Sequence, residues 1–107
     1  MSLFFDHGVD ANIFFPEDTL GWTPMHYAAK NGSLTVLLAL ISRGAGVDPP
    51  DNNQKTPLIV AMENAKVAVA RSLIELGADI EARDSMQRTP LMCACKSGSK
   101  EAVELLL

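Results

Sequence analysis

One stretch, Thr23-Pro24-Met25-His26-Tyr27-Ala28, begins a pattern that the sequence repeats twice. The Thr-Pro pair returns at positions 56–57 and again at 89–90, so both intervals are 33 residues. Other residues keep the same interval: the alanines Ala28, Ala61 and Ala94, the aspartates Asp18, Asp51 and Asp84, and the pairs Gly44-Ala45 and Gly77-Ala78. A fixed interval of this length indicates a repeat architecture, in which each unit is one small supersecondary element.

Each Thr-Pro pair predicts the start of a helix. Threonine is a good N-cap, and proline suits the first helical position because its missing N–H would have no partner there. Helices are therefore expected over about 24–31, 57–64 and 90–97. Gly32 and Gly98 are expected to end two of these helices in the left-handed conformation that glycine tolerates. The second unit has Ala65 instead, which predicts either a different local turn or a strain of about 1 kcal/mol.

A second helix is expected in each unit, over about 34–43, 67–76 and 100–107. Its apolar positions, such as Val69, Ala70, Leu73 and Ile74, lie on one face of a 3.6-residue period. Gly44 and Gly77 are expected to close the first two of these helices. The segments that follow, to the next Thr-Pro pair, are too short and polar for another helix and are expected to be extended turns or hairpins.

These residues resemble the ankyrin repeat. The segment 18–32 is similar to the first half of that repeat, whose pattern is Thr-Pro-Leu-His-x-Ala at a 33-residue period, and the segment 73–81 is similar to its second half. The resemblance implies an all-α solenoid of helix-turn-helix units joined by extended hairpin loops, with one domain over 1–107. Residues 18–50 and 51–83 are then full repeats and 84–107 an incomplete one. Residues 1–17 are the tail of a preceding repeat with a longer loop, and the chain is expected to be a segment of a longer array.

Composition excludes several classes of protein. The chain has 107 residues, enough for one domain, and its formal charge of -4 argues against a nucleic-acid-binding protein. The longest uncharged stretch, 31–42, is far shorter than the ~20 residues of a membrane span. Two cysteines, Cys93 and Cys95, are too few and too close for a disulfide framework. We therefore expect a small, reduced protein of the cytoplasm, with the nucleus as another location.

No residue pattern predicts catalysis, and the sequence indicates no enzyme and no cofactor. The resemblance implies that His26 is structural and bonds the Thr23 hydroxyl and nearby backbone, and Ile59 and Met92 occupy its position in the other units. Cys93 and Cys95 point in nearly opposite directions from a helix, so they are not expected to hold a metal together. Asp6, His7 and Asp10 are interpreted as a solvated helix end.

The resemblance implies a protein-interaction module that binds a partner protein or peptide through a concave face of hairpin tips and first helices. Residues at repeated positions are expected to project from this face. They are Trp22, Tyr27, Lys30, Asn53, Lys55, Glu63, Met86, Arg88 and Lys96. The row formed by Trp22, Lys55 and Arg88 suits an acidic or acidic-apolar partner, because aromatic residues and arginine are enriched at interface hot spots.

Other interpretations remain open at this stage. Trp22 could pack under the longer first loop with Phe14 and Phe15, leaving Lys55 and Arg88 as ordinary solvated charges. The apolar tip formed by Phe14 and Phe15 is either a binding knob or a plug over the first unit. The chain as a whole could also be a structural spacer or a regulatory segment that packs within a larger parent protein. The sequence does not predict an oligomeric state.

Overall fold

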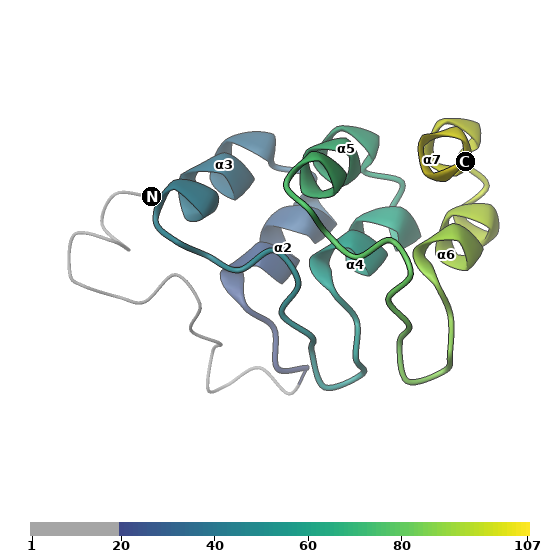
Figure 1. Ribbon diagram of the computed structural model, residues 1–107, viewed down its shortest axis with the longest axis horizontal. Coiled ribbons are helices and arrows are strands. Elements are labelled where there is room, and N and C mark those ends of the chain that lie inside the picture. Colours follow the sequence, from purple (N-terminus) through teal and green to yellow (C-terminus); the bar gives the residue numbers. More distant parts are fainter. Residues whose placement is uncertain (1–19) are drawn as a thin grey trace.

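The computed structural model describes residues 20–107, which form helices in two parallel rows (Figure 1). The expected tail over 1–17, the acidic group of Asp6, His7 and Asp10, and the loop tip of Phe14 and Phe15 lie outside the described residues. The described residues contain helices and turns and no strand, as the all-α prediction requires. Their repeated pairs of antiparallel helices confirm the expected solenoid.

The first row consists of α2 (Pro24–Asn31), α4 (Pro57–Glu63) and α6 (Pro90–Ser97). Each begins directly after a threonine in extended conformation, with proline in its first turn. The hydroxyls of Thr56 and Thr89 each accept a backbone N–H three residues on, at 3.4 Å. The Thr-Pro pair therefore sets where each helix begins, as the sequence predicts.

The second row consists of α3 (Leu34–Ser42), α5 (Val67–Glu75) and α7 (Lys100–Leu106). Ser33 and Ser99 cap α3 and α7 through their hydroxyls, whereas α5 begins after Lys66 without a side-chain cap. Gly44 and Gly77 follow α3 and α5 with φ of 87° and 98°, in the left-handed region expected of them.

The turn between the two helices of a unit has the same conformation in all three units. Gly32, Ala65 and Gly98 have φ of 70°, 55° and 77°. The second unit therefore keeps the turn with an alanine instead of adopting another one. Because a Cβ crowds the backbone in this region, Ala65 carries the strain that was one of the two expected outcomes.

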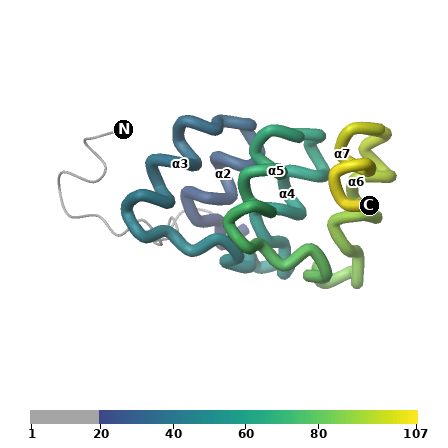
Figure 2. The backbone as a smooth tube through the Cα atoms, turned by 45° about the horizontal axis from the view of Figure 1, so that its top comes forward, coloured from purple at the N-terminus to yellow at the C-terminus, as the bar shows by residue number. Residues whose placement is uncertain are grey.

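The core lies between the two rows and between successive units (Figure 2). Residues of the middle unit are the most completely enclosed, with Ile59, Met62, Val69 and Leu73 at 0% exposure. Met92, which is equivalent to Ile59 one unit later, is 52% exposed. The stacking of units, rather than the packing within one unit, therefore completes the core.

The connecting segments run below the first row as tight turns (Figure 1). They are linked from unit to unit by backbone hydrogen bonds: Asn52 N–H donates to the Leu20 carbonyl and Ser85 N–H to the Asn53 carbonyl, both at 2.8 Å. This linkage fixes the turns beside one another and next to the starts of α2, α4 and α6.

Candidate partner-binding face

The expected binding residues all lie on the turns and on the first row of helices, and we call this surface the candidate face. Two sets of equivalent positions, 33 residues apart, run across it. One set immediately precedes the threonine caps, and the other lies near the ends of the first-row helices. The first set is Trp22, Lys55 and Arg88, and the second is Lys30, Glu63 and Lys96.

Two aspartates shape the turns that present the first set. Asp51 Oδ1 accepts the backbone N–H groups of Asn53 and Lys55 at 2.7 and 2.8 Å. Asp84 Oδ1 accepts those of Met86 and Arg88, each at 2.9 Å. Both carboxylates are buried, so each turn is held by hydrogen bonds to a charged group, which are stronger than bonds between neutral groups. The sequence shows these aspartates as repeated positions but does not indicate their part in the site.

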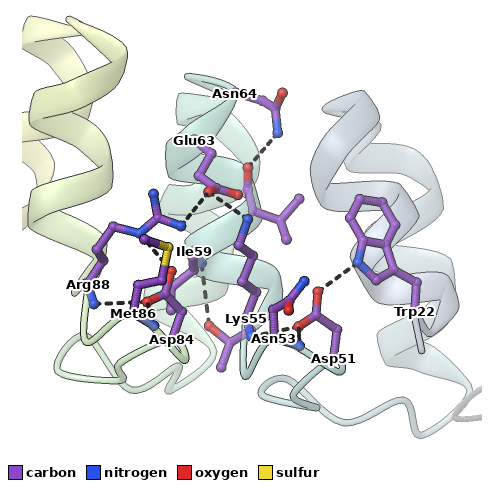
Figure 3. A network of polar contacts seen from close by, with 12 residues as sticks. Trp22, Asp51, Asn53, Lys55, Ile59, Glu63, Asn64, Asp84, Met86 and Arg88 are labelled. Atoms are coloured by element: carbon purple, nitrogen blue, oxygen red, sulfur yellow. Dashed lines mark hydrogen bonds and ion pairs between the residues drawn. The ribbon is translucent and has the colours of Figure 1, made fainter. Parts of the chain in front are cut away.

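The second oxygen of each aspartate has a different partner. Asp51 Oδ2 accepts the indole N–H of Trp22 from the preceding unit at 2.8 Å, whereas Asp84 Oδ2 accepts Arg88 Nε at 2.9 Å (Figure 3). Burial by itself raises the pKa of Asp84. The hydrogen bonds from the backbone and side chain of Arg88 and from the backbone of Met86 outweigh that effect, so its pKa lies below the ordinary value.

Trp22 does not project from the candidate face, which corrects our expectation. It is 8% exposed, packs edge-on against Tyr27 at 4.9 Å between ring centres, and stacks on His26 at 5.7 Å. The Lys30 ammonium lies 5.7 Å from the centre of its ring, within range of a cation–π interaction. The hydrogen bond from its indole to Asp51 makes this burial possible, because a buried indole N–H needs an acceptor. Any contact between Trp22 and a partner stays a prediction.

Lys55, Glu63 and Arg88 form one ion-pair network between the second and third units (Figure 3). Lys55 Nζ lies 2.9 Å from Glu63 Oε2, and a terminal nitrogen of Arg88 lies 3.8 Å from the same oxygen. All three side chains are about one quarter exposed. Lys55 and Arg88 therefore do not project freely from the candidate face, which was the main expectation. They are also not ordinary solvated charges, which was the alternative.

The other predicted residues are accessible. Met86 is 70% exposed and Tyr27 is 38% exposed. Asn53, Lys30 and Lys96 are also exposed. The candidate face thus combines accessible aromatic, apolar and cationic side chains with a partly buried network between them.

A hollow of about 270 Å³ opens between α4 and α6, and Glu63, Arg88, Cys93, Lys96 and Ser97 line it. Cys93 is 3% exposed, and its burial, together with the nearby Glu63 carboxylate, raises the pKa of its thiol. Cys93 therefore contributes a neutral wall to the hollow. The sequence predicts three of these five residues individually, namely Glu63, Arg88 and Lys96, but not that they surround one hollow.

His26 has the structural role expected of it. It is fully buried, its Nδ1 accepts the Thr23 backbone N–H at 3.0 Å, and the Thr23 hydroxyl lies at the same distance. Its Nε2 lies 2.8 Å from the carbonyl oxygen of Lys55 and donates to it, because Nδ1 is the acceptor. His26 thereby joins the first unit to the second.

Among residues 20–107, no group of three or more histidine, cysteine or acidic side chains is placed to bind a metal ion. Cys93 is buried and Cys95 exposed, on different sides of α6 as expected. None of the helices in this part of the chain is both long and apolar enough to span a membrane.

Comparison with known proteins gives one family. The family model described as ankyrin repeats (3 copies) matches residues 1–84 and, in a second match, residues 46–107. A search of curated proteins gave no match. The two overlapping matches extend along the entire chain.

Proposed function

This chain belongs to the ankyrin-repeat family, and from that premise we propose that it binds a partner protein or peptide through the candidate face. Ankyrin repeats are generally protein–protein interaction modules, and the family is typically non-catalytic. Function in such a module depends on surface residues that differ from unit to unit while the core repeats.

The observation that carries the proposal is the composition of the accessible part of this face. Tyr27, Met86, Lys30 and Lys96 are exposed on it without being needed to fill the core. Tyrosine and methionine are enriched at protein interfaces, and the two lysines add positive charge beside them, which attracts a partner of opposite charge. They support an acidic or acidic-apolar partner, which would neutralise the lysines and bury the apolar groups.

A capture experiment with matched variants tests the proposal. The face variant carries Lys30→Gln, Met86→Ala and Lys96→Gln, which leave the bond between Trp22 and Asp51 and the ion-pair network intact. The control carries Lys66→Gln, Leu38→Ala and Lys100→Gln, which remove one exposed leucine and one lysine from helices of the second row and the lysine that directly precedes α5. Circular dichroism and melting first establish that both variants are folded.

We expect a partner that wild type and control bind equally and that the face variant binds at least about tenfold more weakly, equivalent to about 1.4 kcal/mol. Equal binding by all three proteins, or no partner for any of them, contradicts a binding role for this face.

A second candidate function is a structural spacer or regulatory segment within a larger parent protein. The observation that favours it is that part of the face is occupied by its own contacts, since Glu63 pairs with Lys55 and Trp22 bonds Asp51. In that case the substitutions of the face variant weaken packing of this segment within the parent protein, and no separate partner is captured by wild type.

A further inference from the structure

The hollow between α4 and α6 is the part of the candidate face that is best suited to one kind of chemical group. We propose that it binds a single carboxylate from an acidic side chain of the partner, held by Arg88 and Lys96. This inference rests on the proposed function and names the chemistry of one contact within it.

The guanidinium of Arg88 is held by a hydrogen bond at its Nε, while its terminal nitrogens make no close hydrogen bond to a carboxylate of the described residues. Its Nε is bound to Asp84 at 2.9 Å, which orients the guanidinium plane. Its terminal nitrogen lies 3.8 Å from Glu63, well beyond the 2.7–2.9 Å of a charge-assisted hydrogen bond. Figure 3 shows the remaining nitrogen on the side of the guanidinium away from Asp84, with no dashed line to any residue drawn. Two terminal nitrogens of a held guanidinium can bind one carboxylate with parallel hydrogen bonds.

Glu63 is kept from filling this position. Its Oε2 is bound to Lys55 at 2.9 Å, on the side of the second unit. Lys55 therefore holds the intramolecular carboxylate at a distance from Arg88, and an incoming carboxylate can approach Arg88 more closely than Glu63 does.

The local charges leave a surplus of one positive charge. Lys55 pairs with Glu63 and Arg88 with Asp84, whereas Lys96, on the wall of the hollow, takes part in no ion pair within the described residues. Cys93 adds no charge, because the raised pKa of its buried thiol keeps it protonated. Ser97 adds no donor, because its hydroxyl donates to the Ala94 carbonyl at 2.8 Å. One carboxylate neutralises the surplus, whereas a doubly charged phosphate would leave a net negative site beside Glu63.

The equivalent positions of the other units lack this arrangement. Lys30 corresponds to Lys96, but Trp22 takes the place of Arg88 there and lies under the lysine. Lys55 corresponds to Arg88, but it is occupied by Glu63. Lys30 therefore provides a control lysine in the same helical position and on the same face.

The test is an NMR titration of the ¹⁵N-labelled chain with N-acetyl-glutamate N-methylamide, and with its glutamine analogue. We expect saturable shifts of the Arg88 Nε–H and of the Lys96 and Ser97 amides with glutamate alone, with a Kd on the order of 30 mM, because the two partly exposed ionic contacts to Arg88 and Lys96 are each weak. Lys96→Gln should weaken binding about threefold or more, and Glu63→Gln should strengthen it about threefold. Lys30→Gln should leave it unchanged.

Several results would overturn the inference. These are equal shifts with both probes, no saturation, or equal weakening by Lys30→Gln and Lys96→Gln. Tighter binding of N-acetyl-phosphoserine N-methylamide than of the glutamate probe would assign the hollow to a phosphorylated partner instead. Since Lys96 makes no ion pair with any residue over 20–107, its variant remains informative if changes at Arg88 disturb the turn. If the face variant loses a partner while the glutamate probe does not bind, only this inference fails, and the proposed function stands.

Discussion

At the scale of single residues, the two buried aspartates show how one repeated position acquires different roles. Asp51 and Asp84 hold their turns with the same two backbone hydrogen bonds. The free oxygen of Asp51 then reaches back to Trp22 of the preceding unit, and that of Asp84 binds Arg88 of its own turn. One joins two units, and the other fixes a side chain of the candidate face.

Replacing Asp84 with asparagine should produce a pH-dependent loss of stability. The pKa of Asp84 in the folded chain lies below the ordinary 3.8. Its ionised form therefore stabilises the fold fully above that pH, and this contribution is lost as the pH falls through the lowered value. In urea unfolding, the free energy of unfolding of Asp84→Asn should be about 2 kcal/mol below that of wild type at pH 7. This difference should become smaller below pH 3.8. A deficit independent of pH would show that ionisation of Asp84 is unimportant.

His26→Ala should destabilise the chain by about 2–3 kcal/mol, because it leaves the buried Thr23 N–H and Lys55 carbonyl without their partner. Met92→Ala is the matched control at the same repeat position, where the side chain is 52% exposed, and should cost less than about 0.5 kcal/mol. Thermal or urea denaturation measures both values. Similar losses for the two variants would argue that His26 contributes packing alone.

At the scale of helices and turns, the repeat keeps its geometry even where a residue is unfavourable. The turns after α2, α4 and α6 all use a left-handed residue, although that residue is alanine in the middle unit. The flanking helices pack against neighbours on both sides there, and this packing holds the turn against the local preference of alanine.

Ala65→Gly should therefore raise the free energy of unfolding by up to about 1 kcal/mol, since it relieves the crowding of the Cβ. Gly98→Ala should lower it by about 1 kcal/mol, and nothing obstructs the added Cβ, so the change isolates the backbone effect. Chemical denaturation of both variants checks the opposite signs. A loss of stability in Ala65→Gly would mean that the turn carries no strain.

The boundaries of the helices were predictable from the sequence to within about one residue, because Thr-Pro pairs, serine caps and left-handed residues mark both ends. Which side chains contact one another was less predictable from the sequence. Register places Lys55, Glu63 and Arg88 on one face, but the distances between them depend on how far one unit is rotated and shifted against the next. The burial of Trp22 was not predictable for the same reason, since its hydrogen-bond acceptor lies 29 residues away in the turn of the next unit.

At the scale of the whole molecule, stability is distributed along the stack. Ile59 and Met62 are fully buried between units, whereas the equivalent Met92 and Cys95 on the last described unit are exposed. In a linear array each unit is stabilised by packing against its neighbours, so local opening is easier where the equivalent packing residues are exposed.

Hydrogen exchange should accordingly be slowest in α4 and at least about tenfold faster in α7, a difference of about 1.4 kcal/mol in opening free energy. Mass spectrometry or NMR of the native chain measures both helices in one sample. Equal protection of α4 and α7 would indicate that the described units open only together.

The contact between Trp22 and Asp51 also gives the molecule an internal optical probe. Trp22 is the single tryptophan of the chain, and its indole N–H is bonded across the boundary between the first two units. Its emission spectrum therefore reports on the first unit and that boundary, while circular dichroism averages over every helix. Recorded together during unfolding, the two signals separate the parting of the first two units from the melting of the array.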